Sequence, residues 1–268
     1  MFVVRDTMFK KESRMLNHTM DQIAGLKLHG LQTALNEQMD QPGNYSNLSF
    51  EERLAHLVDR EVTERRNQKI KRLLGLSRLK YKQAYVEDIE YHERRNLHRS
   101  QVQSLLQNQW INQKQNVIIT GPTGTGKTWL ACALAVNAIT SEYSASYMRI
   151  AHLLSEIMLV RAEGSYLKWL KKISRYSLVI LDDLGLSSLT ISQAQELLEV
   201  IEERQGSGSC IITSQLPVKE WYSYFKNPTV ADAIMDRLVH NAYRINLQGD
   251  SMRKVKNKVV AQNEPKVD

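Results

Sequence analysis

One eight-residue segment restricts the fold of this 268-residue chain more than any other. Residues 121–128 read Gly-Pro-Thr-Gly-Thr-Gly-Lys-Thr and match the phosphate-binding pattern G-x-x-x-x-G-K-[ST] in full. The apolar residues 116–120 before them predict a buried strand, and the Ala-rich residues 129–139 after them predict a helix. Glycines let backbone N–H groups surround a polyphosphate, and the helix N-terminus adds partial positive charge. We therefore expect a strand–loop–helix unit that binds a nucleotide.

Two residues of this loop have sharper expected roles. Lys127 is placed to reach the β- and γ-phosphates, and the Thr128 hydroxyl is placed to ligand Mg²⁺. The complete set assigned to nucleotide binding is Gly121, Pro122, Thr123, Gly124, Thr125, Gly126, Lys127 and Thr128.

A second segment, residues 177–183, is an apolar run that ends in two carboxylates. Such a run suits a central strand of a parallel sheet, and ligands bind at the carboxyl ends of these strands. We expect Asp182 to hold Mg²⁺, directly or through water, and Asp183 to be the base that positions the attacking water. An isolated Asp-Asp pair is more often a solvated strand end, but the phosphate loop upstream favours the metal-site interpretation.

Three further residues are candidates for sensing or stabilising the γ-phosphate. Gln215 follows another apolar strand, residues 209–213, with Thr213 and Ser214 behind it; the alternative is a strand that simply runs into a turn at Pro217. Arg237 and Arg253 can supply the cation that a phosphoryl-transfer transition state needs, because a guanidinium binds phosphate in a bidentate manner. Taken alone, each arginine is more typical of a surface salt bridge.

The remaining pattern predicts an α/β fold. Strands are expected at 146–150 and 242–247, and helices at 151–163, 166–174, 192–205, 218–226 and 229–240. Alternating strands and helices imply a parallel sheet covered on both faces. Cys132 and Cys210 fall in predicted core elements and are expected to be packed side chains rather than a disulfide or metal pair.

No membrane segment is expected, because the chain has no apolar run of about 18 residues. Its first residues are too polar for a signal peptide, which predicts a cytoplasmic protein. The first residues, through about Met15, look extraneous.

The net charge of +7 is concentrated in one stretch, residues 60–82. Nine basic residues there face only two acidic ones. Arg65, Lys69 and Arg72 are spaced to share one helix face, with Arg66 beside them, and such a stripe can contact DNA phosphates. The alternative is a solvated helix face, with the DNA surface near Lys168, Lys171 and Lys172 instead.

The N-terminal part reads as helical. Apolar residues from Ile23 to Leu35 follow helical spacing, and residues 41–44 end that helix. A capping box, Ser49-x-x-Glu52, opens the next helix, whose apolar positions include Leu54 and Val58. Residues 100–115 are expected to be a connector into the first strand.

Several ordered motifs together resemble the IstB family of bacterial insertion-sequence transposition helper ATPases, which is related to the DnaC helicase loader and more distantly to DnaA. The similarity covers about residues 20–255. Its motifs are the phosphate loop, Leu-Asp-Asp-Leu-Gly at 181–185, Thr-Ser-Gln-Leu-Pro at 213–217, Asp-Arg-Leu-Val-His-Asn at 236–241 and Leu-Ser-Phe-Glu-Glu-Arg-Leu at 48–54.

The resemblance implies an AAA+ type P-loop NTPase fold preceded by a small all-helical N-terminal domain. By motif position it makes Asp182 the metal aspartate, Gln215 the first sensor, Arg237 the arginine finger and Arg253 the second sensor. Asp183 stands where the wider AAA+ pattern has Glu, and Gln215 stands where it usually has Asn. Both departures bear on the rate of hydrolysis.

The domain organisation expected from this resemblance has four parts. They are a poorly ordered tail at 1–19, a helical DNA- or partner-binding domain at 20–99, an AAA+ ATPase domain at 100–253 and a polar tail at 254–268. The expected function is Mg²⁺-dependent ATP hydrolysis that controls self-oligomerisation on duplex DNA, with an IstA-like transposase as partner. The alternatives are a DnaC-like replicative helicase loader and a nucleotide-switched DNA-binding module with negligible hydrolysis.

Overall fold

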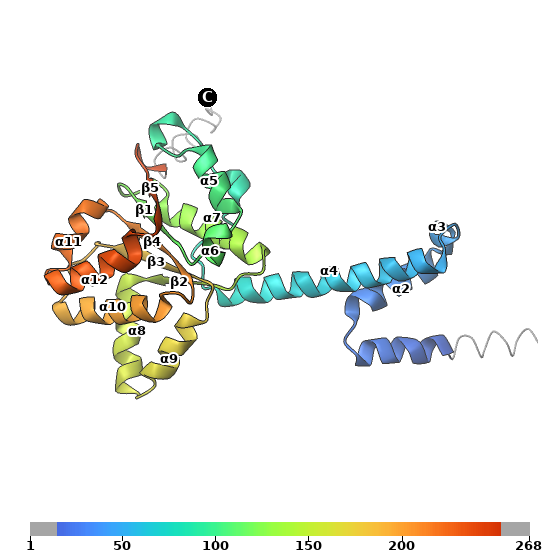
Figure 1. Ribbon diagram of the computed structural model, residues 1–268. Helices are drawn as coiled ribbons and strands as arrows, with labels where there is room; N and C mark the ends of the chain where they lie inside the picture. Colours follow the sequence, from blue (N-terminus) through green and yellow to red (C-terminus); the bar gives the residue numbers. More distant parts are fainter. Residues whose placement is uncertain (1–14, 253–268) are drawn as a thin grey trace, which may run out of the picture. The chain divides into compact units, whose positions relative to one another are not determined.

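The computed structural model of the protein describes residues 15–252. The chain divides into two compact units, Met1–Arg72 and Leu73–Asp268, which we call the N-terminal unit and the sheet unit (Figure 1). The sequence interpretation placed this boundary later, between residues 99 and 100. The boundary falls earlier because residues 73–99 contribute buried apolar side chains to the sheet unit, among them Ala84, Ile89 and Leu97.

The main elements of the N-terminal unit are helices. Residues 15–25 form a helix, so residues 15–19 of the predicted poorly ordered tail are helical; the rest of that predicted tail lies outside the described residues. The next helices are α2 (His29–Asp40), α3 (Pro42–Tyr45) and α4 (Phe50–Leu76). The expected single helical pattern from residue 23 to 35 is wrong, since the chain turns at Lys27, whose φ of 57° lies in the left-handed region. The capping box before α4 is confirmed: Ser49 N–H donates to Glu52 Oε2 (2.7 Å), and Glu52 N–H donates to Ser49 Oγ (3.2 Å).

A buried glutamate joins α2 to α4. Glu61 Oε2 accepts hydrogen bonds from the N–H groups of Gly30 (2.9 Å) and Leu31 (3.1 Å), the first turn of α2. Those groups have no partner within their own helix, so Glu61 satisfies them as an N-terminal cap would. The backbones approach so closely that a Cβ on Gly30 would lie 2.6 Å from the carbonyl oxygen of Arg60. Gly30 is therefore required at this crossing.

The sheet unit contains the predicted parallel sheet. Its strands follow the spatial order β2-β3-β4-β1-β5, and every neighbouring pair is parallel. They are β1 (Asn116–Thr120), β2 (Ala145–Arg149), β3 (Leu178–Leu184), β4 (Ser209–Ser214) and β5 (Ala242–Asn246). The carboxyl ends of β1, β3 and β4 thus lie side by side, which is where ligands bind in such sheets.

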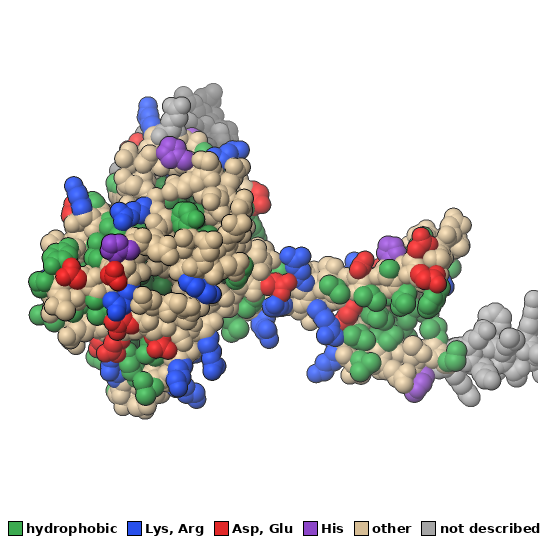
Figure 2. All heavy atoms as spheres, in the orientation of Figure 1, with side chains coloured by type: hydrophobic (Ala, Val, Ile, Leu, Met, Phe, Trp, Pro, Cys, Tyr) green, Lys and Arg blue, Asp and Glu red, His purple; other side chains and the backbone are tan. Residues whose placement is uncertain are grey.

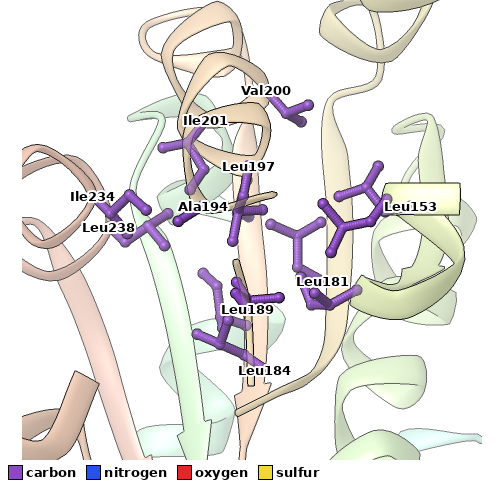
Figure 3. Packing of buried hydrophobic residues seen from close by; sticks show 14 of the residues in the cluster. Leu153, Leu181, Leu184, Leu189, Ala194, Leu197, Val200, Ile201, Ile234 and Leu238 are labelled. Atoms are coloured by element: carbon purple, nitrogen blue, oxygen red, sulfur yellow. The ribbon is translucent and has the colours of Figure 1, made fainter. Parts of the chain in front are cut away.

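Helices cover both faces of this sheet (Figure 1). Helix α7 (Lys127–Thr140) packs on one face, and α8 (Ile150–Ala162), α10 (Ile191–Arg204) and α12 (Pro228–Val239) pack on the other. Figure 3 shows Leu197 and Ala194 of α10 between strand residues such as Leu181 and the α12 residues Ile234 and Leu238. The shorter elements are η1 (Val86–Asp88), η2 (Glu93–Arg95), α5 (Arg99–Leu106), α6 (Gln109–Asn112), α9 (Tyr166–Ser174), η3 (Val218–Glu220) and α11 (Trp221–Tyr224).

Three smaller expectations can be compared with these elements. The predicted connector at 100–115 instead contains α5 and α6, because Trp110 and Ile111 are buried and need regular backbone pairing. Both cysteines are buried and unpaired, as expected. None of the helices between residues 15 and 252 is both long and apolar enough to cross a membrane.

Candidate nucleotide site

The phosphate loop connects β1 to the N-terminus of α7. Gly124 and Gly126 have φ values of 88° and 92°, a conformation that side chains disfavour, so glycine is needed at both turns. Lys127 begins α7 and is buried, and its Nζ donates to the carbonyl oxygens of Gly121 (2.7 Å) and Pro122 (2.8 Å). Burial lowers the pKa of Lys127, while the carboxylates of Asp183 and Asp182 oppose that shift.

The two predicted carboxylates lie at an irregularity between β3 and β4. Leu181 pairs with Ile212 and Leu184 pairs with Ser214, so two residues of β3 stand opposite Thr213 alone. Such a bulge redirects side chains that regular alternation would separate. The Thr213 hydroxyl accepts from Asp183 N–H (3.0 Å) and donates to Asp182 Oδ1 (2.5 Å).

Asp182 is fully buried and points at the phosphate loop. Its Oδ1 also accepts from the Thr128 hydroxyl (2.8 Å), which joins the two predicted Mg²⁺ ligands directly. Its Oδ2 accepts from the Tyr147 hydroxyl of β2 (2.6 Å). Burial, followed by this hydrogen bond, raises the pKa of Tyr147, so Tyr147 stays protonated and remains a donor. Sequence reasoning missed Tyr147, because no motif marks it and only the pairing of β2 with β3 brings it here.

Asp183 has a different environment. Its φ of 64° is left-handed, and its Oδ2 accepts from Arg149 Nε (3.1 Å) and Nη2 (2.8 Å). The hydrogen bond to Asp183 raises the pKa of Arg149. Asp183 is therefore held in an ion pair on the cleft wall, and Arg149 is a second residue that the sequence interpretation did not identify.

A cleft of about 900 Å³ opens above these groups. Gln215, Asp183 and Arg149 lie on its wall beside the phosphate loop. Residues between 80 and 95, which the sequence interpretation assigned to the N-terminal domain, line the cleft as well. The lining residues from that segment are Lys80, Tyr81, Gln83, Glu87, Asp88, Ile89, Glu90 and Arg95.

The segment after β5 crosses the phosphate loop. Met252 N–H donates to the carbonyl oxygen of Gly124 (2.9 Å), and Met252 lines the cleft. A Cβ on Gly121 would lie 2.3 Å from the carbonyl oxygen of Leu247, so this crossing also requires a glycine. Arg253, the expected second sensor, lies outside the described residues.

Arg237 is not among the residues that line the cleft. It lies on α12, where Nη2 pairs with Glu202 (2.8 Å) and Nη1 donates to the carbonyl oxygen of Ala233 (2.9 Å). Its Nε is buried without a hydrogen-bond partner. The structure thus brings Lys127, Thr128, Asp183 and Gln215 to one cleft, with the buried Asp182 behind it hydrogen-bonded to Thr128, and leaves Arg237 elsewhere in the same unit.

The donor set fits Mg²⁺. No group of three or more His, Cys, Asp or Glu side chains suited to a metal lies within residues 15–252. Mg²⁺ at nucleotide sites is bound by one or two carboxylates together with substrate phosphates, and it prefers oxygen ligands. The Asp182 carboxylate and the Thr128 hydroxyl are oxygen donors at the phosphate loop. These residues therefore suit a cation that arrives with a nucleotide.

Comparison with known families shows to which family the chain belongs. A model described as IstB-like ATP binding protein matches residues 21–261. The chain belongs to this family. The relatives include y4pL of Sinorhizobium fredii, which is named as an insertion sequence ATP-binding protein. It is 41% identical over 90% of this chain and 98% of the relative. A protein of insertion sequence IS1162 from Pseudomonas fluorescens is 42% identical over 76% of this chain and 87% of the relative.

Several solved structures have a fold similar to that of this IstB-like protein. AMPPCP-bound DnaA from Aquifex aeolicus superposes with a TM-score of 0.54 at 16% identity, over 69% of this chain and 57% of DnaA. DnaI superposes with a TM-score of 0.51 at 18% identity, over 68% of this chain and 92% of DnaI. At these identities the likeness shows the fold alone, which is that of an AAA+ type P-loop NTPase, as expected.

Proposed function

We propose that this IstB-like protein hydrolyses Mg²⁺-ATP to control its assembly on duplex DNA, where it assists a transposase of the same insertion sequence. The observation that carries the proposal is the convergence of Lys127, Thr128 and Asp183 on one cleft, with Asp182 hydrogen-bonded to Thr128 directly behind it. Membership of an ATP-binding family whose relatives are named for insertion sequences supports the transposition role.

The proposed reaction assigns one task to each side chain. Lys127 exchanges the carbonyl oxygens of Gly121 and Pro122 for the β- and γ-phosphates. Thr128 and Asp182 hold Mg²⁺, which neutralises phosphate charge when bound. Asp183 orients a water molecule and accepts its proton, while that water bonds to the γ-phosphorus and the bond to the β–γ bridging oxygen breaks. Gln215 contacts the γ-phosphate from the end of β4.

The Arg149–Asp183 ion pair bears on the rate of this step. Both hydrogen bonds from Arg149 go to Asp183 Oδ2. Asp183 can therefore orient a water molecule only with Oδ1, unless the ion pair with Arg149 first breaks. Together with the short Asp side chain, which lies one methylene further from the nucleotide than Glu would, this pair favours slow basal hydrolysis.

Arg237 is proposed to act on the nucleotide of a neighbouring subunit, and Arg253 on the nucleotide of its own. Arg237 must first exchange Glu202 for a phosphate. Its side chain is partly exposed, and Glu202 is more exposed still, so the pair is accessible to another copy. An arginine supplied across a subunit boundary makes hydrolysis depend on assembly.

An exposed apolar surface on the N-terminal unit supports the proposal of self-assembly. Four apolar side chains spaced four residues apart on α4 are exposed, and Figure 2 shows hydrophobic side chains gathered on this unit. They are Phe50, Leu54, Val58 and Val62. A contiguous exposed apolar surface is typical of a protein interface, and we propose a second copy as its partner.

DNA contact is proposed for the basic residues of α4, namely Arg65, Arg66, Lys69 and Arg72. All four are exposed on one helix. Arg65 also donates to Glu61 Oε1 (2.6 Å), so its charge is shared with the joint between α2 and α4. The alternative surface is α9, where Lys168, Lys171 and Lys172 are exposed beside the buried Trp169 and Ile173.

Steady-state ATP turnover with and without duplex DNA tests the enzymatic part of this proposal. We expect slow turnover that duplex DNA increases, and no turnover in Lys127→Ala. Turnover indistinguishable from Lys127→Ala under all conditions would leave a nucleotide-switched binding module. Pull-down with the transposase and with a replicative helicase distinguishes the partner, and retention of the helicase alone would favour a loader.

A further inference from the structure

Four carbonyl oxygens of the phosphate loop accept described hydrogen bonds from side chains or from a distant backbone N–H. The carbonyls of Gly121 and Pro122 accept from Lys127, and that of Gly124 accepts from Met252 N–H. The Thr125 carbonyl accepts from Arg95 Nη2 (3.1 Å), a residue that no sequence motif marks.

Arg95 is built into the cleft wall. Only 7% of the residue is exposed, and Nη1 donates to the carbonyl oxygen of Glu90 (2.5 Å). Its Nε is buried without a hydrogen-bond partner, and a Cβ on Gly126 would lie 3.1 Å from Nη2. Its own carbonyl oxygen accepts from Gln248 N–H (3.0 Å). Through its side chain and its own carbonyl group, Arg95 therefore connects the 86–95 segment, the phosphate loop and the chain after β5.

The direction of the Thr125 carbonyl group is important because the same peptide bond carries the Gly126 N–H group. A trans peptide is planar, so its C=O and the following N–H point in opposite directions. Fixing the Thr125 oxygen therefore fixes the direction of the Gly126 N–H. Backbone N–H groups that point into such a loop are the groups that bind phosphate.

We propose that Arg95 is a positioning residue of the nucleotide site, which holds the Thr125–Gly126 peptide so that its N–H faces the phosphates of ATP or ADP. Lys127 must leave the carbonyl oxygens of Gly121 and Pro122 to reach those phosphates. Arg95, in contrast, keeps its hydrogen bond to the Thr125 carbonyl oxygen both without and with a bound nucleotide. The role is one of preorganisation, which lowers the ordering cost of binding. This inference rests on nucleotide binding at the loop.

Fluorescence anisotropy with N-methylanthraniloyl-labelled ADP and ATP tests it. Arg95→Ala should raise the dissociation constant of both nucleotides by about tenfold or more, because it removes charge-assisted hydrogen bonds. The turnover number at saturating ATP should fall far less than the affinity, since Arg95 is not assigned to the reacting atoms. The matched control is Arg94→Ala, which removes the same charge from an exposed neighbour and should bind like the parent.

Added guanidinium ion should restore part of the nucleotide affinity of Arg95→Ala and leave Lys127→Ala unchanged. If Arg95→Ala does not fold, Arg95→Lys serves instead and should weaken binding several-fold, because one ammonium cannot span the two carbonyls as a planar guanidinium does. Parental affinity in either folded variant, or a fall in turnover without a fall in affinity, would overturn the role. Parental affinity in Lys127→Ala would instead show that the loop is not the nucleotide site.

Discussion

The sheet unit and the N-terminal unit differ in how much they bury. Among residues 15–72 only Gly30, Ala34 and Glu61 are buried, although the sheet unit also exposes large apolar side chains such as Leu167. In the sheet unit, polar groups such as Asp182, Thr213 and Lys127 are buried and hydrogen-bonded. In the N-terminal unit, apolar side chains such as Phe50 and Val62 stay exposed at 66% and 60%. A buried polar network is costly unless it is satisfied, so it marks a preformed site, whereas exposed apolar groups mark a surface that awaits a partner.

We propose from this contrast that the sheet unit carries the nucleotide chemistry, while the N-terminal unit carries contacts with DNA or with other copies. Variants at the nucleotide site of the sheet unit should change nucleotide binding or turnover, and should change DNA association only through the nucleotide. Variants in the N-terminal unit should change association with DNA or with other copies and leave turnover without DNA little changed.

The largest effect is expected for Lys127→Ala. Loss of the ammonium removes the cation that meets the β- and γ-phosphates, so ATP binding and hydrolysis should both be lost. Isothermal titration calorimetry and phosphate release measure the two losses. Lys219→Ala, at an exposed lysine of η3, is the control and should behave as the parent. Parental turnover in Lys127→Ala would show that the site is misassigned.

Arg237→Ala should bind ATP but lose hydrolysis by about 10³-fold, the scale of a transition-state arginine. Mixing Arg237→Ala with Lys127→Ala should restore some turnover, because an intact loop in one subunit then meets an intact arginine from another. Absence of complementation in mixed assemblies would count against action across a subunit boundary.

Asp183→Asn should lower turnover by about 10²-fold or more while ATP still binds, because the amide keeps the shape but cannot accept the proton. The DNA-bound assembly should persist longer in this variant. Single-turnover hydrolysis and DNA dissociation measured together check both effects. Loss of ATP binding would make Asp183 a metal or structural residue.

Replacing Arg65, Lys69 and Arg72 by Ala should weaken binding to any duplex by a similar factor and flatten the salt dependence by roughly 0.9 per lost contact. Turnover without DNA should change little. Fluorescence anisotropy at several salt concentrations measures this effect. The matched control removes Lys168, Lys171 and Lys172 from α9. If only the control loses affinity, the DNA surface lies on α9.

The smallest effect is expected from the Glu61 joint. The hydrogen bond from Arg65 is the largest influence that lowers the pKa of Glu61. A lowered pKa in the folded state stabilises the fold above the ordinary Glu pKa, and that stability is lost as the pH falls through the lowered value. Glu61→Gln keeps an acceptor oxygen for the N–H groups of α2 but removes the negative charge at the helix N-terminus, so it should cost about 0.3–1 kcal/mol and should remove this acid dependence. Helical circular dichroism against pH shows whether the acid dependence persists.

Much of the sheet unit can be predicted from the sequence, because strong local patterns coincide with its elements. The glycine loop, the apolar run before Asp182 and the alternation of strands and helices fix the sheet and the positions of Lys127 and Thr128. Asp183 was assigned a role, but its left-handed backbone and its ion pair with Arg149 depend on a bulge that spacing does not show.

The residues that were missed come from segments without a motif. Tyr147 reaches Asp182 only because β2 pairs with β3, and Arg95 reaches the loop only because the 86–95 segment folds over it. The turn at Lys27 escaped prediction because the flanking apolar residues keep helical spacing on both sides. Each of these positions depends on contacts between segments that are distant in the sequence or on a local turn, and local residue patterns do not predict either.

The central claim is that the nucleotide bound in the sheet unit controls association with DNA. The most direct measurement is the affinity of the protein for a fluorescent duplex with ATP, with ADP and without nucleotide, at fixed salt. We predict tighter binding with ATP than in the other two conditions, and no such difference in Lys127→Ala. Equal affinity in all three conditions for the parent protein would contradict the account.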